Sequence, residues 1–449
     1  MIQMECIAPH SISLETMDCA AIRQFATRPF RLCAALFNEE SPESREVQFE
    51  LDYGEPPAHR GWAWKHQSPI LLPGGRWLIN YAFDSEDVHM FCWDLSTLLF
   101  EEPVLEPAAK IQLDTFGWEI VSWTAQSFPE TNSYMILLVK VAEDPNGIRS
   151  FLLWEIIELT WCASPYTAPK FSNLARCERI PPVAADDFLA EQSSLFGEYV
   201  LCVTPRLVYV WNWRINQWGA IDTVGQEVMD FDENTGNSDG WIQNESVFVL
   251  MKKAAGILVF PLPPLNSIDE PPVVHSLSSQ VHSFPVLFDD PLYSSHSVVG
   301  LCRPPSGQIH QVRVHTRRDN AGGRASLFVD AIAGSDENEL PSPRILAGGV
   351  FPLHSNSHAQ HLFADTFITA SIKLEHSPDG AFLPIRIYSR SQFRITHTSL
   401  QTSILCNRRH EARFNSAPCA LSGTFMINER YTELPRQPWQ AAFSLLKFD

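Results

Sequence analysis

The sequence has no run of about 20 uninterrupted apolar residues, the length that crosses a bilayer as a helix. Its first residues, Met1 to Cys6, also lack the basic stretch and apolar core of a secretory signal. We therefore expect no membrane partner and an intracellular location, in the cytoplasm or the nucleus.

Cysteine pairs of the Cys-x-x-Cys type are absent as well, although the chain has 10 cysteines. They are spread from Cys6 to Cys419, unlike the dense disulfide frameworks of small secreted domains. Several, such as Cys92 and Cys202, lie inside apolar runs, where a free thiol behaves as a small hydrophobe. We expect reduced cysteines that serve packing.

Positive charge is scarce. The formal net charge is −19, and residues 1 to 299 hold 17 basic against 40 acidic residues, whereas residues 300 to 449 hold 16 against 12. An acidic chain repels the phosphate backbone, so we expect no nucleic-acid partner.

The usual phosphate-binding glycine motifs, GxxxxGK and GxGxxG, are also missing. Gly236 to Gly240 fits the GxSxG pattern of hydrolases, but that motif needs a helix after its serine. Here Ser246 to Leu250 reads as a strand, and we interpret residues 230 to 240 as an exposed acidic hairpin loop.

Two metal-like patterns fail on inspection. Asp230, Asp232 and Asn234 imitate a calcium loop, but its sixth and twelfth positions are Thr235 and Trp241 instead of glycine and glutamate. A weak cation site of another kind stays open as an alternative. The second pattern consists of His354, His358 and His361. Their spacing would suit zinc only in a helix, whereas the sequence of this segment predicts a loop. We expect no catalytic, cofactor or metal-binding residue.

What the sequence does contain is apolar material for a large folded structure. Hydrophobic residues make up 45% and charged residues 19% of the 449 residues, a length beyond that of most single cores. One helix is predicted after Ser13, where Leu14, Met17, Ala21 and Phe25 recur at helical spacing. Short β-branched and aromatic runs fill the rest of the chain.

Several of these runs repeat one another. Val88 to Leu95 is echoed by Ser150 to Ile156, by Leu207 to Trp213 and, more weakly, by Gly256 to Leu262. Their aligned aromatic residues are Trp93, Trp154, Trp211 and Phe260. These positions are 61, 57 and 49 residues apart, somewhat longer than the roughly 40 to 50 residues of standard β-propeller repeats, and long loops would account for the excess.

Proline and glycine turns separate pairs of alternating strands, as in Pro73 to Gly75, Pro145 to Gly147, Pro305 to Gly307 and Pro378 to Gly380. We predict an all-β propeller of about six or seven blades behind a helix and linker at 1–44, with the propeller at 45–449. The predicted blades are 62–105, 115–165, 190–225, 240–280, 293–334, 357–398 and 401–449. Glu46 to Leu51 is expected to pair with the last blade. Two stacked β-sandwiches are the alternative.

Three segments carry a family resemblance: Arg28 to Leu32, Leu71 to Ile79 and Phe91 to Leu95. After the predicted helix, they resemble large fungal F-box proteins, in which an F-box precedes a WD40-like propeller. The resemblance implies a ubiquitin-ligase adaptor that recruits substrates. An F-box opens with a Leu-Pro pair and several helical turns, and only about a dozen residues precede the helix here. We expect the F-box itself to be absent from this chain, and no ligase-binding residue is carried over.

Two further segments are candidate interaction sites. Pro261 to Leu265 could form a polyproline ligand, or simply connect two blades, which we favour. The second is a basic surface that could bind an acidic protein. Alternation along the strand places Val312 and Val314 on one face and four polar or basic residues on the other: Gln311, Arg313, His315 and Arg317. Six further arginines would join this surface: Arg386, Arg390, Arg394, Arg408, Arg409 and Arg413. A solvated strand face is the simpler interpretation.

We therefore expect a non-catalytic module that binds a protein or peptide through the propeller loops, with no cofactor and no small-molecule substrate. The alternatives are a propeller enzyme, such as a glycosidase with channel carboxylates, and a structural subunit of a larger assembly.

Overall fold

The computed structural model describes residues 17–31, 44–54, 65–83, 88–96, 104–128, 133–143, 149–161, 168–184, 193–223 and 240–283, with short gaps, and the strand backbones between 293 and 448. Within these residues, no helix is long and apolar enough to span a bilayer.

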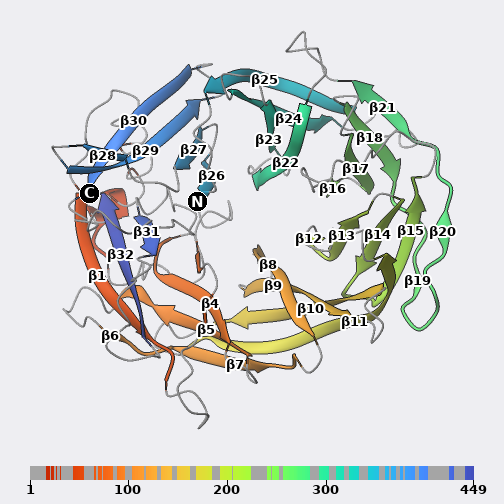
Figure 1. Cartoon of the computed structure of the whole chain (residues 1–449), viewed down its shortest axis with the longest axis horizontal. Coiled ribbons are helices and arrows are strands. Elements are labelled where there is room, and N and C mark those ends of the chain that lie inside the picture. The colour runs from red at the N-terminus through yellow and green to blue at the C-terminus, as the bar shows by residue number, and fades with distance from the viewer. Residues whose placement is uncertain are drawn as a thin grey trace.

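The described strands form seven sheets that follow one another around a ring (Figure 1). Sheet A has β31 (Thr424–Asn428), β32 (Gln440–Phe448), β1 (Ser44–Asp52) and β6 (Val104–Leu105). Sheet B has β2 (Lys65–His66), β4 (Trp77–Phe83), β5 (Val88–Asp94) and β7 (Ala109–Leu113), with β3 (Ile70–Leu71) on β4. Sheet C has β8 (Glu119–Phe128), β9 (Ser133–Glu143), β10 (Arg149–Thr160) and β11 (Lys170–Ala184).

Four more sheets complete the ring. Sheet D has β12 (Ser193–Phe196), β13 (Tyr199–Val203), β14 (Leu207–Asn212), β15 (Gln217–Asp222), β19 (Asn266–Ser267) and β20 (Val274–His275). Sheet E has β16 (Gly240–Gln243), β17 (Ser246–Met251), β18 (Gly256–Pro261) and β21 (Gln280–Ser283). Sheet F has β22 (Tyr293–Cys302), β23 (His310–Arg317), β24 (Gly323–Ile332) and β25 (Ser342–Pro352). Sheet G has β26 (Ala359–Phe363), β27 (Thr366–Ala370), β28 (Glu375–Ser377), β29 (Gly380–Ser389) and β30 (Arg394–Thr402). The all-β class is confirmed.

Sheet A pairs the first described strand of the chain with the last one. β1 pairs antiparallel with β32 along its whole length, from Ser44 opposite Phe448 to Asp52 opposite Gln440. The predicted pairing of residues 46–51 with the last strands is therefore confirmed.

Sheets B to E, whose side chains are described, pack face to face, so that sheets C and D are buried on both sides. The packing of β9 explains its continuously apolar sequence. Met135, Leu137 and Val139 pack against sheet D, while Ile136 and Leu138 pack against sheet B. Sheets D and E share a third cluster around Trp241 and Phe248. Successive side chains of a strand point to opposite faces, so a strand covered on both faces needs no polar alternation.

The four repeated aromatic residues occupy equivalent positions. Trp93, Trp154, Trp211 and Phe260 lie in β5, β10, β14 and β18, each the third strand of its antiparallel meander, and all four are fully buried. Trp154 stacks on Trp211 across the junction of sheets C and D, with ring centroids 6.0 Å apart. Burying one such ring contributes roughly 4 to 6 kcal/mol of hydrophobic free energy.

The four predicted proline-glycine turns each separate two antiparallel strands. The best-described one joins β3 to β4, where Gly74 and Gly75 adopt φ values of 100° and 71°. Only glycine takes these angles without steric cost, which fixes the hairpin register.

Two connections depart from the predicted blade boundaries. The chain between β5 and β7 of sheet B places β6 parallel to β1, on sheet A. The chain between β18 and β21 of sheet E likewise adds β19 and β20 to β15 of sheet D. We call the second connection, residues 262–279, the outer strap.

The outer strap is held by specific contacts. The indole of Trp218 donates a hydrogen bond to the carbonyl of Glu270 at 2.9 Å, and Ile268 is buried in the cluster between sheets C and D. A Cβ atom on Gly219 would lie 2.6 Å from the carbonyl oxygen of Pro264, so glycine is required for this approach.

β11 was not predicted and carries three register shifts against β10. It uses 15 residues where β10 uses 12, because each β-bulge inserts an extra residue. Leu174, the extra residue of one bulge, is 43% exposed. Bulges at an outer strand discourage pairing with another chain.

The predicted N-terminal helix falls largely outside the described residues. Cys19, Ala20 and the residues 22–24 are helical, and the amide of Ile22 donates to the carbonyl of Asp18 at 3.0 Å. Its predicted length stays a prediction. The described cysteines are free thiols, as expected, and Cys92, Cys177 and Cys202 are buried.

Candidate functional site

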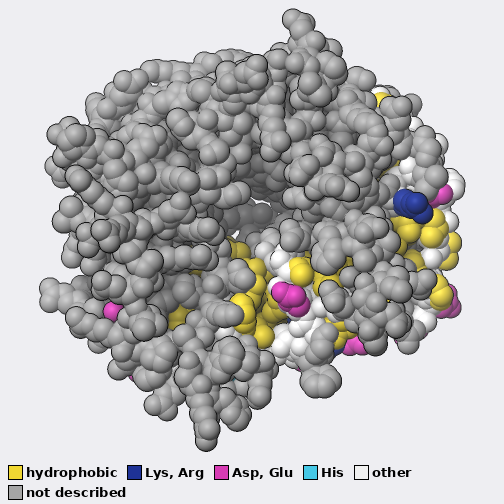
Figure 2. Space-filling model, viewed as in Figure 1, with side chains coloured by type: hydrophobic (Ala, Val, Ile, Leu, Met, Phe, Trp, Pro, Cys, Tyr) yellow, Lys and Arg dark blue, Asp and Glu magenta, His cyan; other side chains and the backbone are white. Residues whose placement is uncertain are grey.

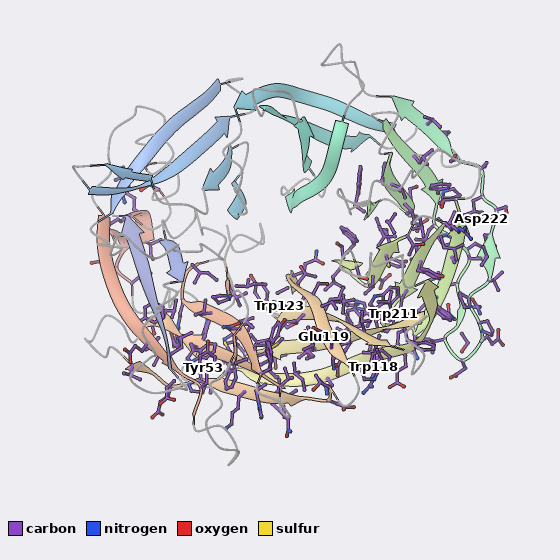
Figure 3. All side chains as sticks on the ribbon, in the orientation of Figure 1. Tyr53, Trp118, Glu119, Trp123, Trp211 and Asp222 are labelled. Carbon is purple, nitrogen blue, oxygen red and sulfur yellow. The ribbon has the colours of Figure 1, made fainter. Side chains whose placement is uncertain are left out.

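The inner strand β8 is one of the two edge strands of sheet C, and β11 is the other. β8 pairs with β9 alone, and all side chains from Trp118 to Gln126 are at least partly exposed, whereas residues 134–140 of β9 are buried. Figure 3 labels Trp123 toward the inner side of the ring and Glu119 near the start of the same strand. Figure 2 shows hydrophobic side chains with an acidic one among them in this region, next to the central hollow.

Three aromatic side chains form a row between sheets B and C. Tyr81 meets Trp123 edge to face, with ring centroids 5.9 Å apart and an interplanar angle of 79°, and its centroid lies 6.3 Å from that of Phe83. Tyr81 is buried, whereas Phe83 and Trp123 are partly exposed. Burial raises the pKa of the Tyr81 phenol, and the charge of Glu119 raises it further, so the phenol stays neutral.

Glu119 is the exposed first residue of β8. Among the residues that the structure describes, no lysine or arginine forms an ion pair with it. Glu119 lies opposite Val141, on the face of sheet C toward sheet D, whereas Trp123 lies opposite Leu138, on the face toward sheet B. We name Phe83, Tyr81, Trp123 and Glu119 the β8 surface.

The cations of this junction are held by other groups. Lys140 lies opposite Ile120 of β8, but its Nζ is 2.5 Å from Glu155 Oε2 and donates a hydrogen bond to the carbonyl of Asp114 at 2.6 Å. The side chains of both ion-pair partners are almost fully buried, at 0% and 4% exposure.

Arg176 of β11 forms the outer part of this network. It contacts the carboxylates of Asp114 and Glu178 at 2.9 and 2.5 Å. Burial acts to lower the pKa of the Arg176 guanidinium, but the hydrogen bond and charge of Asp114, together with Glu178 and Glu155, raise it. Asp114 follows β7, so the network joins sheets B and C.

Of the segment 236–240, the structure describes only Gly240. Gly240 begins β16, and the predicted strand at 246–250 is confirmed as β17, where a nucleophile elbow would need a helix. Ser238 and the calcium-like residues Asp230, Asp232 and Asn234 lie outside the described residues.

The three histidines of the zinc-like pattern are only partly described. His361 lies in β26, opposite Ile368, while His354 and His358 lie outside the described residues. Within the part of the chain that is described, no group of three or more His, Cys, Asp or Glu side chains is placed to hold a metal ion.

Pro261 to Leu265 connects two sheets, as the favoured interpretation predicts. Pro261 ends β18 of sheet E, and the segment then reaches Gly219 of sheet D, against which Pro264 packs. A segment fixed in this way does not present itself as a polyproline ligand.

The predicted basic face is confirmed as strand but not as a surface. Arg313 and Arg317 lie in β23 of sheet F, and Arg386 and Arg394 lie in β29 and β30 of sheet G. Their side chains, and the remaining arginines of that group, lie outside the described residues.

Sequence reasoning did not single out the β8 surface. Its residues come from two sheets, and Tyr81 and Trp123 are 42 positions apart, so no local motif joins them. The one available signal was Glu119 directly after Trp118, an acid at the start of a strand rich in aromatic and β-branched residues.

No protein-family model and no curated protein matches the chain. Several β-propeller structures are similar to it. The WD40 domain of SCAP from fission yeast is 10% identical with a TM-score of 0.37, covering 86% of this chain and 84% of that one. The β-propeller domain of Nup133 from Vanderwaltozyma polyspora is 8% identical with a TM-score of 0.38, covering 89% and 100%. An α-L-arabinanase from Penicillium chrysogenum is 10% identical with a TM-score of 0.35, covering 91% and 99%.

Proposed function

We propose that this chain is a seven-bladed β-propeller that binds another protein and catalyses no reaction. The proposal is carried by the β8 surface, where Trp123 is partly exposed toward the inside of the ring and the exposed Glu119 carboxylate has no ion-pair partner among the described residues. Elsewhere in sheets B to E, the large aromatic residues are mostly buried in the junctions between sheets. Aromatic side chains that stay partly exposed are enriched at protein-binding surfaces.

The proposal includes an intracellular location, in the cytoplasm or the nucleus. The resemblance to fungal F-box proteins extends it to the recruitment of a protein for ubiquitin ligation. No residue of the chain is assigned to contact with a ligase.

Affinity capture with quantitative mass spectrometry tests the proposal. The bait is the full chain, compared with Glu119→Lys and with Glu106→Lys, a matched charge reversal at an exposed residue next to β6. We expect specific partners that the wild type and Glu106→Lys recover and that Glu119→Lys loses about tenfold. Recovery of chaperones alone, or the same partners from all three baits, would contradict the proposal.

The alternative of a glycoside-cleaving propeller is favoured by one observation, the exposed Glu119 carboxylate on the strand that also carries the partly exposed Trp123. Such catalysis needs a second carboxylate roughly 5 to 10 Å away. Hydrolysis or cleavage of a panel of polysaccharides, abolished by Glu119→Gln, would replace binding with catalysis as the function.

A further inference from the structure

We infer that two copies of this chain meet at the outer rim of sheets D and E, where β21 of one copy pairs with β21 of the other. The contact is made by residues 271–283, which we name the outer edge; they comprise the last part of the outer strap and β21. The β8 surface takes no part in this contact, so the proposed function does not depend on it.

Among the described strands, β20 and β21 have neighbours on one side only. β21 pairs antiparallel with β18 and ends sheet E, and β20 pairs parallel with β15 of sheet D. Between the two strands the exposure of the side chains alternates, and Leu277 packs against the cluster between sheets D and E. The free side of an edge strand presents backbone N–H and C=O groups that another strand can pair with.

The outer edge lacks the features that usually protect such strands, which are charges and bulges. The outer strands of sheets B and C have them: β7 carries Lys110, and β11 carries Arg176, Glu178 and three register shifts. Residues 271–283 contain no Asp, Glu, Lys or Arg, and β21 pairs with β18 without a register shift. The outer edge is therefore suited to pairing with a further strand.

Apolar side chains are exposed along the same residues. Val273, Val274 and Val281 are 48%, 49% and 57% exposed, and they are three of the eight large hydrophobic residues exposed in the described part of the chain. Figure 2 shows hydrophobic side chains at the right-hand rim, where Figure 1 places β20 and β21. β-Branched side chains such as valine favour strands and pair well across two of them.

Charge favours this edge as the place where two copies meet. Each chain has a formal net charge of −19, so two copies repel one another over much of their surface. A twofold axis brings the outer edge onto the same edge of the second copy, where no like charges face each other. The second copy thus supplies an open backbone and exposed valines of its own, and both edges are covered at once.

Sedimentation velocity of the full chain tests the inference. We expect a monomer–dimer equilibrium with a dissociation constant of roughly 1 to 100 μM, because a contact of this length buries less area than a standard interface. Hydrogen exchange at both ends of this concentration range should be slower within the outer edge in the dimer.

A charge placed on the edge should separate the copies. Val281→Lys adds one ammonium from each copy at the seam, and we expect it to weaken the dimer about tenfold or more. Ile215→Lys is the matched control, because Ile215 is also 57% exposed but lies in the turn between β14 and β15. It should change the dissociation constant less than about twofold at physiological salt, which screens distant charges. If circular dichroism shows that Val281→Lys is unfolded, Val274→Lys takes its place, with the same expected result.

Three results would overturn the inference. One is a full chain that stays monomeric over the whole range, which would leave the edge to a strand of another protein. The second is a dimer that Val281→Lys and Ile215→Lys weaken equally or not at all. The third is a dimer in which the exchange of the outer edge is unchanged. None of these results bears on partners that depend on Glu119, so the proposed function is tested separately.

Discussion

Replacing Lys140 by methionine tests the buried charge network between sheets B and C. The substitution keeps the aliphatic stem of the side chain but removes the ammonium that contacts Glu155 at 2.5 Å and the Asp114 carbonyl at 2.6 Å. Glu155, 4% exposed, would be left as a buried carboxylate without its ammonium partner. Breaking such a pair costs about 3 to 5 kcal/mol. Arg176 lies directly opposite Glu155, and its positive charge partly compensates for the lost ammonium. We therefore expect the free energy of unfolding to fall by about 3 kcal/mol.

Urea unfolding measures the loss, and hydrogen exchange of β9 and β10 shows whether it is local. Lys110→Met is the matched control, because Lys110 is exposed on β7, and it should change the free energy of unfolding by less than about 0.5 kcal/mol. The double variant Lys140→Met/Glu155→Leu removes both charges and should return to within about 1 kcal/mol of the wild type. A double variant as unstable as Lys140→Met alone would refute the reasoning, since the damage would then come from packing.

Three further predictions concern separate parts of the fold. Gly219→Ala places a Cβ atom 2.6 Å from the Pro264 carbonyl oxygen, so we expect a loss of about 1 to 3 kcal/mol in urea unfolding and faster proteolysis of the outer strap; unchanged proteolysis would count against the close approach. Iodoacetamide at pH 8 should modify the exposed Cys19 but not Cys202 in a peptide map, because burial raises the pKa of the Cys202 thiol to about 11; similar rates at both would show that this burial is wrong. Burial opposes ionisation of Asp94, but the hydrogen bonds from Arg76 and Ser96 outweigh burial and lower the pKa of its carboxyl group. The stability that ionised Asp94 adds is therefore fully present above about pH 4, the pKa in the unfolded chain, and is lost as the pH falls through the lower pKa of the folded protein. The difference in unfolding free energy between wild type and Asp94→Asn should shrink accordingly in acid, and a difference that does not vary with pH would exclude this linkage.

Sequence reasoning identified the repeat because its signal is local. In sheets B to E, the third strand of the meander is buried, which favours a continuous apolar run around Trp93, Trp154, Trp211 and Phe260. Turn signals were equally local, since a residue such as Gly74 needs a positive φ whatever surrounds it.

The missed elements lack such local signals. β11 contains Pro181 and Pro182 and lies at the outer edge, where bulges and polar residues dilute the strand pattern. β6 and β20 have only two residues each and exist because another sheet offers a partner strand. The β8 surface is likewise assembled from two sheets, so its members could not be joined before the packing of β4 against β8 was known.

The pairing of β1 with β32 also determines when sheet A can form during synthesis of the chain. Almost 400 residues separate the partners, and at about 5 to 20 residues per second a ribosome needs roughly 20 to 80 s to bridge them. Throughout that interval the edge that β32 will cover is open in the nascent chain. Sheets B to E, made of consecutive hairpins, can form first, and sheet A must be the last to assemble. Until β32 emerges, the open edge of β1 is a pairing site for any other exposed strand.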